Sequence, residues 1–318
     1  MPDTPSWKRP ANLGPILMIL ASLAFTLMVA CVKIARAEMS ALEIATWRGL
    51  SSIPLAWLLA RGASRHVQAK GWMTLRVVFG FGAMTCFFTS AKGLPIADLS
   101  LIGRLQPLLI ALAAPLILGV AERSDRRIWG LMLVGVAGCA VILGPGLAVG
   151  NVYGLWALAA IALSTVAHIT LRALGATDDP RVVVMVFQIG VTILALLTTT
   201  LITGTLPSPP RQGLWLPLLG VGVLATIGQL LMTQGYALAT AARVSAASHT
   251  SPVWGIGVDI VLFSLWPSPS MILGGTVVML AVFGLLHLEK STLPDECHED
   301  PSPPSPRLDH DESGLPGL

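Results

Sequence analysis

The amino-acid sequence predicts an all-α integral membrane protein with ten transmembrane helices, arranged as two inverted five-helix repeats with both termini in the cytoplasm. Three observations support this fold class. Only 12% of the 318 residues are charged and the mean hydropathy is +0.75, whereas roughly a quarter of the residues in a soluble domain are charged. Continuous apolar runs fill most of the chain, and lysine and arginine gather in alternate connections between these runs.

The apolar runs predict helices, because the strands of a membrane β-barrel alternate polar and apolar residues in short segments. With a window of about 20 residues, the expected spans are 12–34, 41–60, 71–91, 95–119, 127–144, 151–173, 181–203, 213–239, 243–264 and 269–288. The groups that end successive spans are Arg36, Arg61, Lys92, Glu122, the Gly-Pro-Gly run 144–146, Arg172, the Pro-rich run 207–210, Arg243, Pro267 and Lys290.

The two ends of the chain differ in character. The first span follows Lys8 and Arg9 but is longer than the apolar region of a signal peptide, so we expect the protein to retain it. Residues 291–318 hold seven of the 17 acidic residues together with several prolines. Such a segment has little apolar area to bury, so the sequence predicts a disordered acidic tail.

The distribution of lysine and arginine predicts the orientation. Four basic residues fall in the connections opposite the N-terminus: Lys33, Arg36, Lys92 and Arg211. Twelve fall on the N-terminal side: Lys8, Arg9, Arg61, Arg65, Lys70, Arg123, Arg126, Arg127, Arg172, Arg181, Arg243 and Lys290. The positive-inside rule therefore places both termini in the cytoplasm of a multi-pass protein of the inner (cytoplasmic) membrane. This excess of positive charge explains the basic body of the chain without nucleic-acid binding.

The chain also matches itself. At an offset of 145, Arg104 aligns with His249 and Pro107 with Pro252, and at an offset of 140 Arg48 aligns with Gln188. The spans then fall into two sets of five, 11–146 and 150–288. Because five is an odd number, the second set must cross the membrane in the opposite sense, as in transporters built from inverted repeats.

The residues between Phe88 and Gly146 resemble the second half of an EamA domain: a small-residue turn, a proline in the fourth span, the Glu122–Arg123 pair after it and a glycine-spaced fifth span. The motifs FTLMVACVKIA and EIATWRGL resemble the start of that domain, and the resemblance covers about residues 11–288. It implies membership of the drug/metabolite transporter superfamily, which pairs two such domains. In the second half Pro267 replaces Glu122 and Gln188 replaces Arg48, so any role of these positions is expected to be asymmetric.

Two ionisable residues at repeat-equivalent positions are the leading candidates for binding solute. Arg104 lies about nine residues into its span, where it can either bind an anionic group of the solute or form a structural pair with Asp98 or Glu43. His249 can exchange a proton in the physiological pH range or serve as a packing residue.

Other polar residues in the spans are weaker candidates. Thr226, Gln229, Thr233 and Tyr236 share one helical face and either line a cavity or hold helices together, and Trp254 is a further candidate contact for solute. Candidates for coupling or for structural ion pairs are Arg48 with Glu43, Asp98, His168 and Asp259; for Arg48 we expect a pair with a carboxylate.

We therefore expect a secondary transporter that moves a small polar metabolite, of the amino-acid, riboflavin or nucleoside-like class that the resemblance implies, by alternating access with proton coupling or exchange. A drug or metabolite efflux permease of broad specificity is the alternative, and a channel is a third. An enzyme is not expected, because the sequence contains no HExxH motif or paired-aspartate signature. The absence of a Walker A motif predicts that the transport energy comes from the gradient of the solute or of a coupled ion. No catalytic residue, cofactor or metal site is predicted. Besides the solute and the bilayer, a second copy of the chain is a candidate partner.

Overall fold

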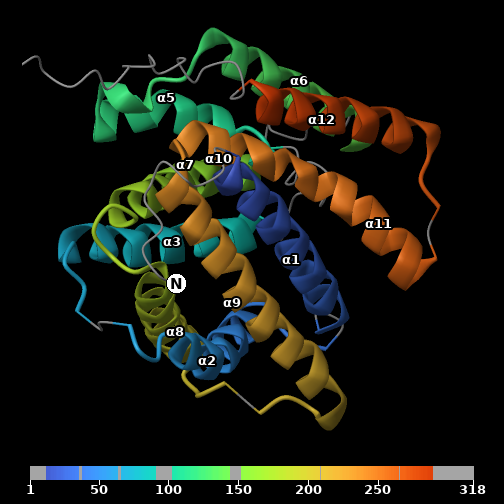
Figure 1. Ribbon diagram of the computed structural model, residues 1–318. Coiled ribbons are helices and arrows are strands. Elements are labelled where there is room, and N and C mark those ends of the chain that lie inside the picture. Colours follow the sequence, from blue (N-terminus) through green and yellow to red (C-terminus); the bar gives the residue numbers. More distant parts are fainter. Residues whose placement is uncertain are drawn as a thin grey trace, which may run out of the picture.

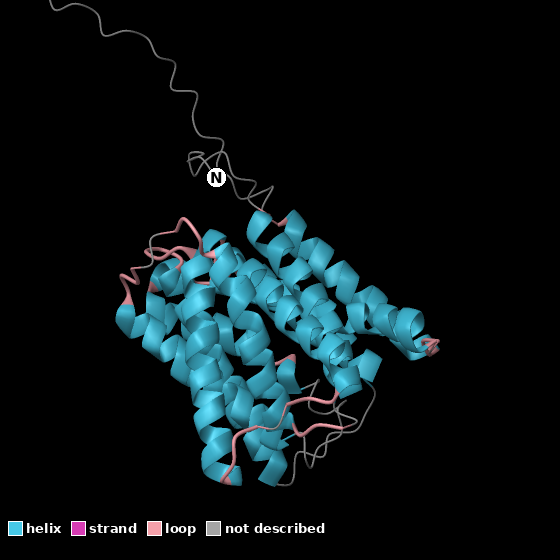
Figure 2. Cartoon of the chain, turned by 90° about the horizontal axis from the view of Figure 1, so that it is seen from below, coloured by secondary structure: helices cyan, strands magenta, loops and turns pink. Residues whose placement is uncertain are grey.

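The structure is a computed structural model that describes residues 12–35, 38–63, 66–90, 102–143, 152–207, 209–264 and 266–288. Within these ranges the regular structure is helical and no strand occurs (Figure 2). The prediction of an all-α fold is therefore confirmed for this part of the chain. The segment 291–318, expected to be a disordered tail, lies outside the described residues.

Eight of the expected spans each correspond to one long helix. These helices are α1 (Leu13–Ala35), α2 (Ala41–Leu59), α3 (Lys70–Ser90), α6 (Arg126–Leu143), α7 (Val152–Leu174), α8 (Pro180–Thr203), α9 (Trp215–Leu238, preceded by the 3₁₀ turn η3, Gln212–Leu214) and α12 (Pro269–His287). Five segments are long and apolar enough to cross a membrane: Leu13–Val32, Val152–Leu174, Pro180–Thr203, Gln212–Leu238 and Pro269–His287. The full set of ten spans and its orientation stay predictions.

The other two expected spans, 95–119 and 243–264, are not continuous helices. In the first, a turn at Arg104 and Leu105 precedes α5 (Gln106–Leu118), which the 3₁₀ turn η2 (Val120–Glu122) follows. In the second, α10 (Ala241–Ala247) runs into a 3₁₀ turn, η4 (Ser248–Thr250), before α11 (Ser251–Phe263). Proline fits the first turn of a helix and breaks its interior, and Pro107 and Pro252 are the second residues of α5 and α11. α5 and α11 therefore each begin one residue before a proline.

The most extensive helix packing joins the two halves of the sequence. α1 packs along α9, α3 along α7 and α6 along α12, while α2 contacts both α8 and α9 (Figure 1). If each helix is exchanged for its counterpart in the other half, the pair α1 and α9 becomes α7 and α3, and the pairs α6 with α12 and α2 with α8 are unchanged. The packing thus follows the internal repeat.

Large apolar side chains cover the outside of the helices. Leu116, Leu201, Leu216 and Trp266 are each 81–85% exposed. A soluble monomer rarely presents extended apolar surface, and a lipid environment accepts it. The main core cluster includes Ile110, Met132, Ile169, Tyr236 and Leu285, drawn from both halves of the chain.

Glycine allows the closest approach between α6 and α12. A Cβ atom on Gly138 would lie 2.8 Å from Val278 Cγ2 and 2.9 Å from the carbonyl oxygen of Gly274, whereas a Cβ on Gly130, also in α6, would meet nothing within 4 Å. We therefore expect Gly138→Ala to lower the free energy of unfolding by about 1–3 kcal/mol through overpacking.

Thermal unfolding of the detergent-purified protein measures this effect. Gly130→Ala is the matched control, because it brings the same gain in helix propensity without the clash. Equal unfolding temperatures for the two variants would contradict the prediction.

Candidate solute-binding site

The two helix breaks bring Arg104 and His249 together. α10 packs against α5, and the Arg104 Nη1 atom donates a hydrogen bond to the carbonyl oxygen of Ser248 at 3.1 Å. In return, His249 Nε2 lies 3.3 Å from the carbonyl oxygen of Arg104. Each side chain therefore reaches the backbone at the break of the other half. The two repeat-equivalent residues singled out in the sequence thus meet at one place.

His249 is enclosed at this junction. It is 1% exposed, its Nδ1 atom lies 2.8 Å from the carbonyl oxygen of Ala246, and Gly135 of α6 leaves room for the ring. Both ring nitrogens thus face carbonyl oxygens, which accept hydrogen bonds only from N–H groups. A neutral imidazole has one N–H and can satisfy one of these carbonyls, whereas an imidazolium can satisfy both. The hydrogen bonding of His249 therefore depends on its protonation.

A second polar group lies two residues beyond Arg104. The Gln106 Nε2 atom is 2.7 Å from Ser164 Oγ and 2.9 Å from His168 Nδ1. The ring of His168 is 5.7 Å, centroid to centroid, from the ring of Tyr236, whose buried hydroxyl has no hydrogen-bond partner. Polar side chains of α5, α7 and α9 therefore form one continuous tract inside the helix bundle.

The polar face predicted for α9 has two kinds of members. The hydroxyls of Thr226 and Thr233 donate to carbonyl oxygens of α9 itself, those of Gly222 at 2.8 Å and Gln229 at 2.7 Å. The side chain of Gln229 reaches another helix, because its Oε1 atom accepts a hydrogen bond from Arg76 Nη2 at 2.9 Å. Gln229 therefore extends the polar tract to α3.

The expected pair between Arg48 and Glu43 is not formed. Glu43 completes a capping box with Ser40 at the start of α2: its Oε2 atom accepts from the Ser40 N–H at 2.8 Å, and Ser40 Oγ accepts from the Glu43 N–H at 3.3 Å. Arg48 instead places Nη1 3.7 Å from the sulfur of Met84. A glutamate at the third helical position satisfies orphan N–H groups, so the local cap takes precedence over the ion pair.

Three remaining candidates can be placed only in part. Asp98 lies outside the described residues, and for Asp259 only the backbone, within α11, is described. Trp254, also on α11, has a buried indole N–H without a hydrogen-bond partner. Trp254 therefore offers a buried N–H donor that lacks a hydrogen-bond partner. The roles expected for Asp98 and Asp259 stay predictions.

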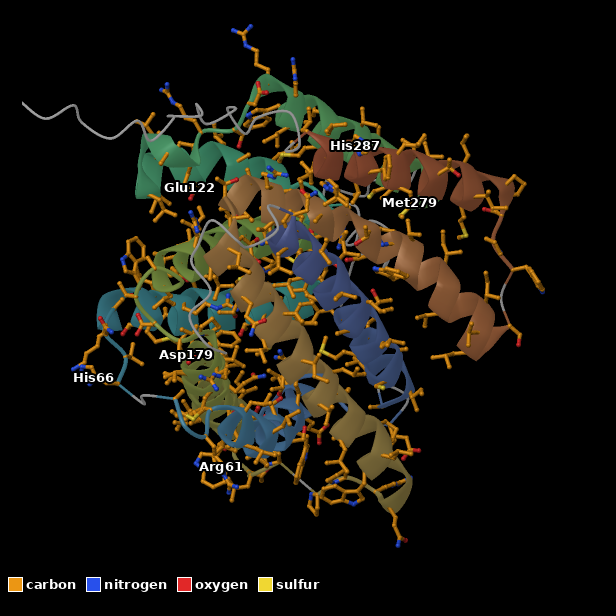
Figure 3. All side chains as sticks on the ribbon, in the orientation of Figure 1. Arg61, His66, Glu122, Asp179, Met279 and His287 are labelled. Carbon is orange, nitrogen blue, oxygen red and sulfur yellow. The ribbon has the colours of Figure 1, made fainter. Side chains whose placement is uncertain are left out.

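Two carboxylates tie the halves together beside the tract. Glu122, which is labelled in Figure 3, accepts from Arg172 Nε at 2.6 Å and from the Ala241 N–H at 2.8 Å. Arg172 also donates to the carbonyl oxygens of Tyr236 and Ala237 at the end of α9. Asp178 caps α3 by accepting from the N–H groups that precede this helix, at 2.7 and 3.2 Å.

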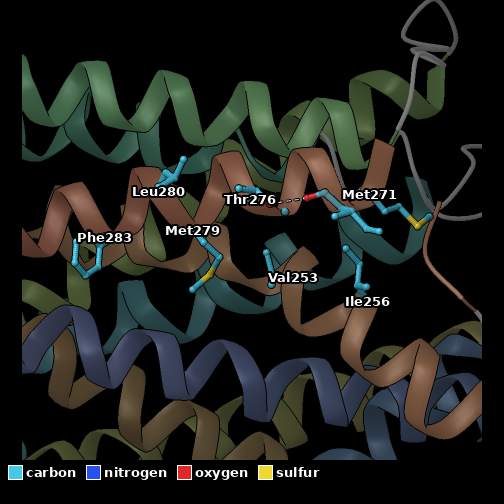
Figure 4. Close-up of a pocket in the computed structure, with 9 residues that line it drawn as sticks. Val253, Ile256, Met271, Thr276, Met279, Leu280 and Phe283 are labelled. Atoms are coloured by element: carbon cyan, nitrogen blue, oxygen red, sulfur yellow. Dashed lines mark hydrogen bonds between the residues drawn. The ribbon is translucent and has the colours of Figure 1, made fainter. Parts of the chain in front are cut away.

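An apolar groove lies elsewhere, outside this tract. It has a volume of about 520 Å³ and runs along α11 and α12, lined among others by Val253, Ile256, Met279 and Phe283 (Figure 4). The only hydrogen bond drawn there, from the Thr276 hydroxyl to the carbonyl oxygen of Ile272, stays within α12. Since no lining residue carries a charge, this groove lacks the groups that recognise a polar solute. The buried tract is the better candidate.

Comparison with known families decides the class of the protein. The model of the EamA-like transporter family matches residues 12–144 and 151–287. The chain belongs to the EamA-like transporter family. It contains two EamA repeats, as the sequence predicted, and is a multi-pass membrane protein of the transporter type.

Curated relatives of this EamA protein are transporters. It is 28% identical over 280 residues to the pseudopaline exporter CntI of Pseudomonas aeruginosa, a match that covers 87% of this chain and 97% of the exporter. It is 27% identical to an uncharacterized transporter of Helicobacter pylori (86% and 93% covered) and 25% identical to a riboflavin transporter of Vibrio cholerae (72% and 76% covered). A solved crystal structure aligns with a TM-score of 0.71 at 21% identity, covering 88% of this chain and 98% of the other, and shows that the fold is shared.

Sequence reasoning about this EamA chain missed Arg76. Its side chain is 2% exposed and bonds to Gln229 and to the carbonyl oxygen of Ala167, at 3.1 Å. The signal was present, because an arginine several residues inside the span 71–91 is costly in a bilayer and rarely occurs without a role. Arg76 was not singled out because its span begins beside Lys70, among the basic residues that mark the membrane surface.

Proposed function

We propose that this EamA protein is a secondary active transporter that moves a small polar metabolite across the inner membrane by alternating access. The observation that carries the proposal is the reciprocal contact of Arg104 and His249 at the broken helices of the two repeats. Broken helices at the interface between repeats are typical solute and ion sites of secondary transporters. The buried tract of Gln106, His168 and Tyr236 supplies further polar groups to a passing solute.

Proton coupling or exchange is the proposed energy source. His249 supports it, because one additional proton changes how many of its two carbonyl neighbours the ring can satisfy. The solute class follows only from the relatives: the amino-acid, riboflavin or nucleoside-like class is consistent with a riboflavin transporter at 25% identity.

The test begins with the solute. Untargeted metabolite profiling of cells with and without the gene identifies candidates, and flux of those compounds is then measured in proteoliposomes. We expect Arg104→Ala and His249→Ala each to reduce flux about tenfold or more, the effect of losing one hydrogen bond to a charged group. Arg211→Ala is the control, because this arginine is 87% exposed in a surface pair with Glu38. Wild-type flux in both Arg104→Ala and His249→Ala would overturn the assignment of the solute-binding site.

An efflux permease with broad substrates is the second candidate, and the relative named as a pseudopaline exporter favours export. Uptake and efflux assays with the same vesicles distinguish the two directions. Saturation of the flux at modest solute concentration distinguishes a carrier from a channel, whose flux continues to rise.

A further inference from the structure

Arg76 is the most deeply buried arginine, lysine or acidic residue among the side chains that the structure describes. Its hydrogen-bond acceptors are both neutral, the carbonyl oxygen of Ala167 and the side chain of Gln229. Its guanidinium carbon lies 4.1 Å from the centroid of the Phe187 ring, and its Nε atom is buried without a hydrogen-bond partner. Within the part of the chain that the structure describes, no acidic group contacts Arg76 to balance its positive charge.

Arg48 adds a second positive charge to the same region. Arg48 approaches α3, the helix that carries Arg76: its Nη1 atom lies 3.7 Å from the sulfur of Met84, eight residues beyond Arg76. Among the described residues, the hydrogen bond of the Arg48 side chain is this weak one to the Met84 sulfur, and the Arg48 Nε atom is also buried without a hydrogen-bond partner. Among the described side chains, the salt bridges are Arg172 with Glu122, Arg181 with Asp179 and Arg211 with Glu38, so neither Arg48 nor Arg76 is paired with a carboxylate.

We infer that Arg76 and Arg48 form a binding site for an anionic group, a carboxylate of the transported solute; this inference rests on the function proposed above. Two unpaired guanidinium groups inside a membrane protein repel each other and lose hydration, and an anion offsets both costs. Guanidinium stays charged when buried and its planar N–H groups match the two oxygens of a carboxylate.

The neighbouring groups define the solute further. The ring of Tyr236 lies 5.7 Å from the ring of His168, which follows the Ala167 carbonyl that accepts from Arg76, and the Tyr236 hydroxyl is a buried donor without a hydrogen-bond partner. All the unsatisfied groups can therefore donate to oxygen. Phe187 and Met84 present apolar surface to the same arginines. This combination fits a carboxylate attached to an apolar or aromatic body.

Ligand-dependent thermal stability of the purified full-length protein tests the inference. The probes are phenylacetate, phenyl phosphate and phenethylamine, which share a ring and differ in the charged group. We expect phenylacetate to raise the unfolding temperature of the wild type saturably and phenethylamine to leave it unchanged. Arg76→Gln should weaken phenylacetate binding about tenfold or more, since charge-assisted hydrogen bonds are lost, and Arg76→Lys should have a smaller effect.

Arg61→Gln is the matched control, because it removes the same charge from an exposed arginine that stacks on Trp57. If Arg76→Gln does not fold, Arg48→Gln carries the same expectation. Equal phenylacetate affinity in Arg76→Gln and in Arg61→Gln would overturn the anion site. Stabilisation of the wild type by phenethylamine as large as that by phenylacetate would also overturn it. If phenyl phosphate bound and phenylacetate did not, the assignment of a carboxylate as the bound group would be overturned. If phenylacetate bound but no solute flux were measured, the proposed transport function would be overturned, whereas the proposed anion site would be retained.

Discussion

Replacement of Glu122 by alanine is expected to lower the free energy of unfolding by about 2–3 kcal/mol. Removal of one partner of a fully buried ion pair costs about 3–5 kcal/mol, and the value here is smaller because the Arg172 side chain is 31% exposed while that of Glu122 is 6% exposed. The substitution also leaves the Ala241 N–H at the start of α10 without its acceptor. Glu122→Gln should have a smaller effect, because an amide oxygen can still accept this bond.

Unfolding in mixed detergent and dodecyl sulfate micelles measures the change. Glu38→Ala is the matched control: its pair with Arg211 spans 3.4 Å and is exposed on both sides, so we expect about 0–1 kcal/mol. If Glu122→Ala destabilised the protein no more than Glu38→Ala, the contacts of Glu122 in η2 with α7 and α10 would not stabilise the fold.

Asp178→Ala is expected to have an effect of similar size, about 2–3 kcal/mol. The Asp178 carboxylate accepts from the N–H groups of Gln68 and Ala69 and from the Thr177 hydroxyl, at 2.7 to 3.2 Å, and is 7% exposed. These bonds satisfy backbone donors of the two residues that precede α3, and hydrogen bonds to a charged group contribute about 1.5–3 kcal/mol each. Asp178→Asn should lose less.

The adjacent residue provides the control in the same unfolding assay. Asp179 caps its own helix, α8, and pairs with Arg181, which holds the pKa of the Asp179 carboxyl below its usual range. Since this pair is partly exposed and local, Asp179→Ala should cost about 1 kcal/mol, the typical value of a helix cap. A larger loss for Asp179→Ala than for Asp178→Ala would contradict the importance assigned to the contact between halves.

The helix ranges could be predicted closely because they depend on local composition. The first span, expected at 12–34, is α1 at Leu13–Ala35, and the seventh, expected at 181–203, is α8 at Pro180–Thr203. The two breaks were not predicted, although Pro107 and Pro252 were noted. A proline removes one backbone donor, and whether the helix bends or stops there depends on other groups that satisfy the freed carbonyls. Here those groups are Arg104 and His249 of the opposite halves.

The candidate site was predicted in part for the same reason. Repeat symmetry brought Arg104 and His249 to attention, and the structure places them in contact. The predicted pair of Arg48 with Glu43 is not formed, because the Glu43 carboxylate takes part in the capping box with Ser40. Sequence proximity alone does not reveal this competition. Arg76 was overlooked because it follows the basic residues at the membrane surface, and its partner Gln229, 153 residues away, could not be identified from the sequence. Such partners become visible only when the packing of α3 against the second half is known.

The packing of α1 on α9, α3 on α7 and α6 on α12 has a consequence for biosynthesis. Each helix of the first repeat finds its largest partner surface in the second repeat, so the first five helices do not form a folding unit when they leave the ribosome. We expect them to wait in the bilayer, with Arg76 and Arg104 lacking their contacts to Ala167, Gln229 and Ser248, until the second five arrive. Although the chain carries two copies of one sequence motif, we expect it to fold as a single cooperative unit, because a truncation of the second half removes helices on which the first half packs.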